Sequence, residues 1–425
     1  MAYTALCYAQ LDRQSMPILH RTQTFPALMP RFVERFRCIG SNCEDTCCSG
    51  WTIYIDKKTY KAYRNEAVPA LDQLMANMER LDHPETTGSY AMIKTIGEQQ
   101  RCSALQDGMC AVQSHLGESY LSNTCHLYPR ANRRMLGQVE QSISLSCPEA
   151  ARLALLAEDA MDFVEAPVQL RGSLLPQVDA HFGIVPERMA DIRMFCINLM
   201  RTRELALWQR LAMLGTFCES LDALCSGNEQ ARIPDMIENF IRVIENGELT
   251  TALEQIQPDH AAQAMVFATL WAEKGFDTAS AFQRDMMQQI ASRFGADFNG
   301  QVSPEALVGA YRRGLARMDE ALAHTPWLLE NYLVNEMFSQ FVPFKGSSPY
   351  DSYVQLISRF GLLRLLLAVQ CNTDGALPSS ATLASTVQLQ CRRFQHDPSH
   401  AKRVKEALYQ SGWAELARLY RLLRT

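Results

Sequence analysis

The residues best suited to chemistry in this sequence are its cysteines, which number 14 in 425 positions. Four lie in FRCIGSNCEDTCCSGW, residues 36–51, with the spacing C-x4-C-x3-C-C, and four more follow before residue 150. Thiolates are soft, charged donors, and sets of four hold zinc or iron in proteins. The cluster therefore predicts a thiolate-held metal centre, with the candidate ligands Cys38, Cys43, Cys47, Cys48, Cys102, Cys110, Cys125 and Cys147.

Disulfides, zinc and iron compete as explanations of this cluster. Disulfides are the least favoured, because the start MAYTALCYAQLDRQS does not have the pattern of a secretory signal and a 48.0 kDa chain can bury a core without cross-links. The spacing fits paired zinc knuckles only partly and does not fit the usual ferredoxin strings. The choice between zinc and iron stays open, and we expect a cytoplasmic location. Lone histidines such as His115 and His126 are more typical of hydrogen-bonded side chains than of ligands.

Composition and missing motifs exclude several classes of function. A net charge of -5 and a pI near 6.0 give no general electrostatic reason to bind nucleic acid. The most apolar segment, ISRFGLLRLLLAVQC (357–371), carries two arginines and is shorter than the ~20 residues that a membrane span needs. We expect no transmembrane segment, while peripheral membrane association and the oligomeric state stay open. The sequence has no G-x-G and no G-x4-G-K-[ST], which excludes a Rossmann fingerprint and a P-loop.

The elements that must position these cysteines change character along the chain. Residues 1–25 show no sustained periodicity and are expected to be a weakly ordered extension. Residues 26–150 are irregular, with a predicted strand in WTIYID (51–56), a predicted helix near 66–81 and loops that need a metal to hold them. Residues 151–425 are helical almost throughout, with apolar faces along 193–227 and N-cap plus proline signals at Ser303-Pro304 and Asp397-Pro398. The predicted fold is mainly α: a loop-rich, metal-binding N-terminal region with the cysteine cluster, followed by a helical bundle or stack.

Several segments occur in an order that resembles a known family. In the first half these are F-x-C-x4-C-x3-C-C-x-G-W-x-I-x-I-D (36–56), CSALQDGMCAVQSHLG (102–117), LSNTCHLYPR (121–130) and SISLSCPEAARL (142–153). A further segment, ENYLVNEMFSQFVPF (330–344), lies in the helical half. Together they resemble the flagellin lysine N-methylase (FliB) family, whereas the cysteine segments alone resemble a broader bacterial group of zinc- or iron-chelating proteins.

The resemblance implies a cytoplasmic enzyme that transfers a methyl group from S-adenosylmethionine to lysine side chains of flagellin. It also implies a 4Fe-4S cluster held by the cysteine motif, without settling which four of the eight cysteines bind iron. The spacing does not supply the C-x3-C-x2-C of radical S-adenosylmethionine enzymes, so radical and polar transfer both stay open. A polar transfer needs a group that takes a proton. The candidates in the 330–344 block are Glu330, Tyr332 and Glu336.

A non-catalytic alternative uses the same features. A zinc-stapled helical adaptor or chaperone for flagellar proteins would have the same cysteines and helices, but it would have no need for the 330–344 block. The presence of that block favours the enzyme. Iron content and methyl transfer from S-adenosylmethionine distinguish the two hypotheses.

Overall fold

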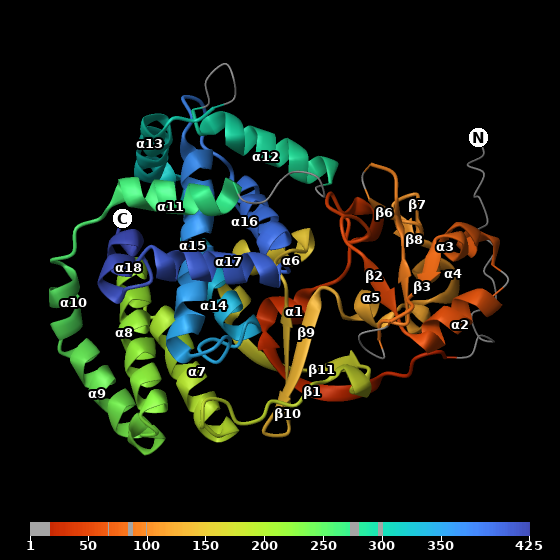
Figure 1. Cartoon of the computed structure of the whole chain (residues 1–425), viewed down its shortest axis with the longest axis horizontal. Helices are drawn as coiled ribbons and strands as arrows, with labels where there is room; N and C mark the ends of the chain where they lie inside the picture. The colour runs from red at the N-terminus through yellow and green to blue at the C-terminus, as the bar shows by residue number, and fades with distance from the viewer. Residues whose placement is uncertain (1–17, 67, 84–87, 99, 273–279, 296–300) are drawn as a thin grey trace, which may run out of the picture. The chain divides into compact units, whose positions relative to one another are not determined.

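The computed structural model describes residues 18–66, 68–83, 88–98, 100–272, 280–295 and 301–425. Contacts divide the chain into two compact units, each of which is described by itself (Figure 1). Unit 1 comprises the described residues up to 24 together with 48–128 and 169–174, and unit 2 comprises 25–47, 129–168 and 175–425. The division falls between the adjacent Cys47 and Cys48. Most of the predicted extension at 1–25 lies outside the described residues.

Unit 1 is built from short strands and short helices. They are β2 (Ile53–Ile55), α2 (Lys57–Asn65), α3 (Asp72–Ala76), β3 (Met78–Arg80), β4 (Ala91–Ile93), β5 (Thr95–Ile96), β6 (Arg101–Cys102), β7 (Leu105–Gln106), β8 (Met109–Cys110), α4 (Ala111–Leu116) and α5 (Asn123–Leu127). β2, β4 and β3 form an antiparallel sheet, while β5 pairs with β6 and β7 with β8. The strand predicted in WTIYID is confirmed as β2.

The helix predicted near 66–81 is wrong over most of its length. Only α3 is α-helical there, and Pro69 lies in a short 3-10 turn before it. Met78 begins β3, which pairs with β4 from Met78 to Arg80. Strand pairing at this position therefore overrides the helical spacing of the apolar residues.

A four-stranded sheet with the order β11-β1-β10-β9 lies mostly in unit 2, with α1 and α6 between its strands in the sequence. Its strands are β1 (Gln23–Pro30), β9 (Arg130–Met135), β10 (Gln138–Ile143) and β11 (Phe163–Leu170). β1 runs parallel to β10, and β10 runs antiparallel to β9. The β9–β10 turn has Leu136 at φ 53° and Gly137 at φ 80°, the positive-φ geometry that matches the twist of the strands. This hairpin was not predicted, because the text of β9, RANRRM, lacks alternating apolar residues.

The rest of unit 2 is helical, which confirms the mainly α fold. The helices are α1 (Arg31–Arg35), α6 (Pro148–Leu155), α7 (Pro186–Met200), α8 (Leu207–Ser226), α9 (Ile233–Glu245), α10 (Glu248–Leu253), α11 (His260–Ala272), α12 (Ala281–Arg293), α13 (Pro304–Leu322), α14 (Leu328–Ser339), α15 (Pro349–Cys371), α16 (Ser380–Phe394), α17 (Pro398–Gln410) and α18 (Leu416–Leu423). Both predicted N-caps are confirmed: Ser303 caps α13 and Asp397 caps α17 through their side-chain oxygens. The stretch at 193–227 divides into α7 and α8.

α15 is the central helix of unit 2, and α8, α11, α13, α16 and α17 pack against it (Figure 1). α13 comes closest at Gly314, where an added Cβ would lie 1.7 Å from the carbonyl oxygen of Ala368. α15 extends the predicted apolar segment to 23 residues. Among the described residues it is the one helix whose length and composition would allow it to cross a membrane, but 89% of its most apolar window is buried inside the fold. Such burial is typical of a core helix in a globular protein.

Candidate functional site

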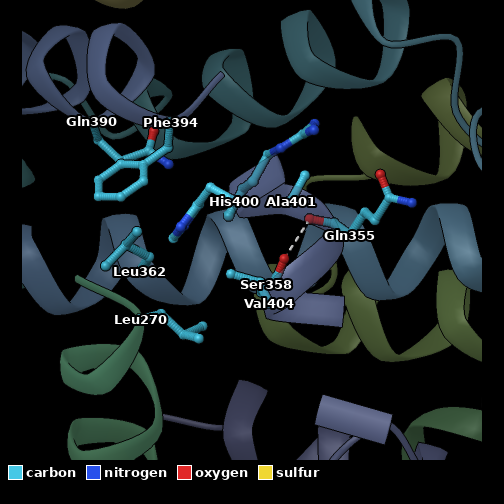
Figure 2. A pocket seen from close by; sticks show the side chains of 10 residues that line it. Leu270, Gln355, Ser358, Leu362, Gln390, Phe394, His400, Ala401 and Val404 are labelled. Carbon is cyan, nitrogen blue, oxygen red and sulfur yellow. Dashed lines mark hydrogen bonds between the residues drawn. The ribbon is translucent and has the colours of Figure 1, made fainter. Parts of the chain in front are cut away.

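A small pocket with a cavity volume of about 20 Å³ lies where α11, α15, α16 and α17 meet in unit 2. α15 contributes one helical face to it, formed by Gln355, Ser358, Arg359 and Leu362. Figure 2 shows Leu362 together with Phe394 and His400, whose side chains point toward a common space. Among the described residues that line this pocket, Arg359 alone carries a permanent charge.

Glu336, one of the residues predicted to take a proton, lies directly behind this wall on α14. Its side chain is 1% exposed, and Arg359 Nη1 donates to its Oε2 at 3.3 Å. Gln395 Nε2 donates to its Oε1 at 2.6 Å. Burial raises the pKa of the Glu336 carboxyl, while the positive charges of Arg359 and Lys345 oppose that rise. The carboxylate therefore holds the guanidinium of Arg359 in the pocket wall.

Tyr332, the second predicted residue, is fully buried one turn before Glu336. Burial and the nearby Glu336 carboxylate raise the pKa of its hydroxyl, which lies beside the amide of Gln390. Gln390 lines the pocket, but neither Tyr332 nor Glu336 does. Each of the two therefore contacts a residue of the pocket wall, Arg359 or Gln390, without lining the pocket itself.

Glu330, the third predicted residue, lies apart from the pocket wall and is 5% exposed. Arg203 Nε donates to its Oε1 at 3.0 Å, and Arg210 Nη1 donates to its Oε2 at 2.7 Å. A buried carboxylate that is satisfied by two guanidinium groups in this way is typical of a packing interaction between elements. This environment indicates a structural role for Glu330.

Four of the eight predicted ligands, Cys38, Cys43, Cys47 and Cys147, belong to unit 2, and we call them the unit-2 thiols. Burial raises the pKa of Cys43 to about 12, and the neighbouring Cys147 and Cys47 add to this rise. Burial also raises the pKa of Cys147 to about 11, with Cys47 and Cys38 adding to it. Thiols gathered in this way repel one another when they ionise, and a bound cation relieves that repulsion.

Backbone N–H groups point at two of the unit-2 thiols. The N–H of Asp45 donates to the sulfur of Cys43, and the N–H groups of Glu149 and Ala150 donate to that of Cys147. Cys147 is the N-cap of α6, where the helix dipole favours a negative charge. Such N–H groups stabilise thiolates and tune the metals that thiolates bind.

The buried Asp45 fastens the loop of the unit-2 thiols to the helices of unit 2. Its Oδ1 accepts hydrogen bonds from Ser280 Oγ at 2.8 Å and Gln283 Nε2 at 3.1 Å, at the start of α12. Its Oδ2 accepts a hydrogen bond from Gln388 Nε2 of α16 at 2.8 Å. The same Gln388 amide donates to the carbonyl of Ser146 at 2.9 Å, next to the fourth thiol. The Asp45 carboxylate thus ties its loop to two helices, and Gln388 links that loop to the segment that carries Cys147.

A chain of side-chain hydrogen bonds runs from the pocket wall toward the same thiols. Gln395 donates to Glu336 and accepts a hydrogen bond from Ser144 Oγ at 2.5 Å. Ser144 Oγ and His396 Nε2 both contact Ser146 Oγ, at 2.8 Å and 2.9 Å. The pocket wall and the segment that carries the fourth thiol therefore belong to one polar network within unit 2.

The other four predicted ligands belong to unit 1 and pack against its core, and we call them the unit-1 thiols: Cys48, Cys102, Cys110 and Cys125. The N–H of Cys102 donates to the carbonyl of Cys48 at 2.7 Å. Burial raises the pKa of Tyr63, and the nearby Cys125, Cys110 and Cys102 add to that rise. The eight predicted ligands therefore fall into two sets of four, one in each unit.

Thiol groups are suitable metal ligands in both sets. In the structure, however, they are not arranged around a common centre. None of the cysteines that the structure describes lies in a disulfide. Among the described residues, no group of three or more His, Cys, Asp or Glu side chains is arranged so that it could hold a metal ion. His115 is exposed on α4, and His126 Nδ1 lies 3.6 Å from Glu118 Oε1.

The family is shown by a comparison over the part of the chain that contains the pocket. The profile of the FliB lysine N-methylase C-terminal domain matches residues 193–422. The chain belongs to the FliB lysine N-methylase family. As a member of this family it is a protein-lysine N-methyltransferase, which favours the enzyme over the adaptor hypothesis.

Curated relatives of this family member cover most of its length. Two proteins named Lysine-N-methylase, from Salmonella typhimurium (strain LT2) and Salmonella choleraesuis (strain SC-B67), are each 24% identical to the chain, over 368 and 364 residues. Each alignment covers 82% of the chain and 86% of the relative. A "Flagellar biosynthetic protein FliU" from Salmonella muenchen is 36% identical over 147 residues, which are 34% of the chain and 86% of that protein. No solved structure gives a significant match.

Several residues of the candidate site were not predicted. Arg359 gave a signal, because it is a charged residue inside the most apolar segment of the chain. Asp45 lies between two of the predicted ligands, yet nothing in the sequence indicated which helices it would bind. Gln388 and Gln390 gave no signal, because a glutamine in an amphipathic helix is usually a solvated residue.

Proposed function

We propose that this chain transfers a methyl group from S-adenosylmethionine to the side-chain nitrogen of lysines in flagellin, in the cytoplasm. The observation that carries the proposal is the family match over residues 193–422, which contain the pocket and the pair of Glu336 with Arg359 behind its wall. The two relatives named Lysine-N-methylase support the reaction class. The name of the flagellar biosynthetic protein supports a flagellar substrate.

The proposed transfer needs a neutral lysine amine in line with the donor's sulfonium methyl group. The ammonium first gives a proton to a carboxylate or to water; the nitrogen–carbon bond then forms as the carbon–sulfur bond breaks, and S-adenosylhomocysteine leaves. Glu336 stays a predicted proton acceptor, whereas the raised pKa of Tyr332 keeps its hydroxyl protonated, so that Tyr332 does not take the proton. Their burial behind the wall supports a second role for Glu336, in which it fixes Arg359 while the proton leaves through water.

We place the proposed iron-sulfur cluster at the unit-2 thiols. The backbone N–H groups on Cys43 and Cys147 support this placement, as does the fastening of their loop by Asp45. A bound cluster would supply a redox-active centre close to the polar network behind the pocket. The unit-1 thiols form a second candidate metal site, and zinc suits it because short strands and loops are what structural zinc commonly stabilises.

The proposed reaction is tested by label transfer to purified flagellin. Protein purified without oxygen is incubated with flagellin and S-adenosylmethionine that carries an isotopic label in its methyl group. Methyllysine is then identified by mass spectrometry after digestion. Flagellin with acetylated lysines is the matched control, because acetylation removes the nucleophilic amine. Label in the unmodified substrate alone supports the proposal, and absence of label from both substrates overturns it.

The proposed cluster is tested separately on the same preparation. A thiolate-bound iron-sulfur centre absorbs broadly near ~400 nm, whereas a zinc-thiolate site is colourless there. We expect the preparation to contain iron and to show this absorbance. A colourless preparation that contains no iron but transfers methyl groups at full rate would refute the cluster and leave the reaction class intact.

A further inference from the structure

We propose that a cavity in unit 1 binds a small molecule through a free α-amino-acid group, that is, an ammonium and a carboxylate on one carbon atom. The cavity, which we call the unit-1 pocket, is lined by residues from 18–22 and 118–119, by His126 of α5 and by Arg171, which directly follows β11. All of these residues belong to unit 1. The inference concerns this cavity alone and does not depend on the proposed function.

The unit-1 pocket has the size of a small-molecule site, and hydrogen bonds hold its walls together. Its cavity volume of about 330 Å³ falls within the range of roughly 300–1,000 Å³ that is typical of such sites. The N–H of His20 donates to the carbonyl of Ser119 at 3.2 Å. Arg171 Nη2 donates to the carbonyl of Leu121 at 3.0 Å. The three segments that form the walls are therefore joined to one another within unit 1.

Arg171 is a buried cation in this wall, and its hydrogen-bond partners are all neutral. Its side chain donates to Asn123 Oδ1 at 2.8 Å and to the carbonyls of Leu121 and Glu118. Its Nε has no partner, and among the described residues no carboxylate lies within ion-pair distance of the guanidinium. The carboxylates of Asp56 and Glu118 influence its pKa from farther away. A buried charge without a counterion is costly, and a ligand carboxylate in the pocket would supply that counterion.

Arg21 gives the same pocket a second guanidinium, which is exposed to solvent. A carboxylate has two oxygens and about four lone-pair sites, so it can accept hydrogen bonds from more than one guanidinium. Hydrogen bonds between guanidinium groups and carboxylates are among the strong ones in proteins. Arg21 and Arg171 therefore favour a carboxylate as one part of the ligand.

The same pocket also contains acceptors for an ammonium. Glu118 supplies a carboxylate whose side chain is 66% exposed. Thr59 Oγ1 donates to Asp56 Oδ2 at 2.6 Å, so it must accept the hydrogen bond that joins it to His20 Nε2 at 2.8 Å. Burial lowers the pKa of His20 to about 4, and its ring is neutral at pH 7. Because Nε2 carries the proton, Nδ1 of His20 is an acceptor.

This combination of charges distinguishes an amino-acid group from two simpler ligands. A lysine side chain in a polypeptide would bring its cation to Arg21 and Arg171 without a carboxylate to pair with them. A phosphate dianion would pair with the two guanidiniums, but it would meet the like charge of Glu118. A free α-amino-acid group satisfies both sets of side chains, because its carboxylate suits the arginines and its ammonium suits Glu118 and His20.

The first test compares ligands that lack one half of this group. Titration calorimetry of the full-length protein is carried out with L-methionine, with L-methionine amide, which has no carboxylate, and with N-acetyl-L-methionine, which has no ammonium. Each of the two derivatives is expected to give a Kd about tenfold or more higher than L-methionine, because each leaves a charged side chain of the pocket unpaired. Inorganic phosphate is the control for simple anion binding.

The second test changes the side chains. Arg171→Gln is expected to raise the Kd for L-methionine about tenfold or more. Glu118→Gln should raise it about threefold or more but leave the Kd for N-acetyl-L-methionine unchanged, because that ligand has no ammonium. Lys61→Gln is the matched control, since Lys61 is exposed on α2 and does not line the pocket. The exposed Glu118 keeps the test decisive even if Arg171→Gln fails to fold.

S-adenosylhomocysteine and adenosine distinguish two sources of the amino-acid group. S-adenosylhomocysteine carries the group and adenosine does not. If S-adenosylhomocysteine binds more tightly than L-methionine and Glu118→Gln weakens it, the ligand is of the methyl-donor type. If L-methionine binds and S-adenosylhomocysteine does not, the ligand is a free amino acid. Either result supports the proposal.

The proposal is overturned if neither compound binds, if phosphate binds more tightly than both, or if Glu118→Gln weakens L-methionine no more than Lys61→Gln does. Label transfer to flagellin is measured on the same preparation. Transfer of label without binding of any amino acid would overturn this inference and leave the proposed function intact.

Discussion

Replacement of Asp45 should both destabilise unit 2 and expose its thiols. The carboxylate is 2% exposed and accepts hydrogen bonds from Ser280, Gln283 and Gln388. Asp45→Ala removes the acceptor of all three donors and cuts the connection between the thiol loop and two helices. The loop should then become mobile enough for reagents to reach the sulfur of Cys43, which is otherwise only partly exposed.

The size of the effect follows from the hydrogen bonds that are lost. A hydrogen bond to a charged group contributes about 1.5–3 kcal/mol, and loss of the carboxylate also removes its own desolvation cost. We expect Asp45→Ala to lower the free energy of unfolding by about 3–5 kcal/mol, a large share of the roughly 5–15 kcal/mol that stabilises a typical domain. Asp45→Asn keeps one oxygen and the shape of the side chain, so it should cost only about 1–2 kcal/mol.

The assay combines urea unfolding with thiol labelling. Unfolding midpoints are measured by circular dichroism for both Asp45 variants, and the rate of labelling of Cys43 by a maleimide is followed by mass spectrometry. The matched control is Glu44→Ala, because Glu44 is the neighbouring loop carboxylate and its pair with Arg152 is only half-buried. Such a pair contributes at most about 1 kcal/mol. If Asp45→Ala unfolds and labels like Glu44→Ala, Asp45 does not fasten the loop.

Three further predictions follow from the geometry. Burial raises the pKa of the Glu336 carboxyl in the folded protein, so the free energy of unfolding should fall as pH rises from the pKa of an unfolded glutamate through that raised pKa; urea melts across pH should show this dependence weaken in Glu336→Gln, and an unchanged dependence would exclude Glu336 as the titrating group. Cys43→Ser should remove iron without removing metal from the unit-1 thiols, and Cys110→Ser should do the reverse; loss of all metal in either variant would contradict two separate sites. Gly314→Ala places a Cβ against Ala368 and should lower the free energy of unfolding by about 1–3 kcal/mol in urea melts, while an unchanged midpoint would mean that the helices move apart at no cost.

Much of the helical fold was predictable because the signals are local. The caps at Ser303 and Asp397 involve residues within one turn of each other, so the text alone locates the starts of α13 and α17. Strands were harder, because their stability comes from distant partners. β3 lies in text with helical spacing, and it is a strand only because Met78 to Arg80 pair with Ala91 to Ile93.

The sequence allowed us to name residue types for the candidate site, but it did not show which of them lie close together. The cysteines could be named from the sequence because residue type reveals the chemistry of thiols, whereas Glu336 was a candidate because it lies in the 330–344 block of the family resemblance. Which groups meet depends on tertiary structure: Arg359 reaches Glu336 from another helix, and Gln388 reaches Asp45 across 343 positions of the chain. Glutamine and arginine residues such as these follow no sequence pattern that would reveal their partners.

The adjacent pair Cys47 and Cys48 shows why spacing alone misleads about the ligand sets. Cys47 and Cys48 lie in a turn, so their adjacency in the sequence does not by itself assign them to one centre. The division between the units falls at this peptide bond, and the carbonyl of Cys48 accepts the N–H of Cys102 while Cys47 influences Cys43 and Cys147. Cys47 therefore belongs to the unit-2 thiols and Cys48 to the unit-1 thiols, although a peptide bond joins them. Cys47→Ser should accordingly reduce metal binding at the unit-2 thiols, and Cys48→Ser should reduce it at the unit-1 thiols, although the two positions are adjacent.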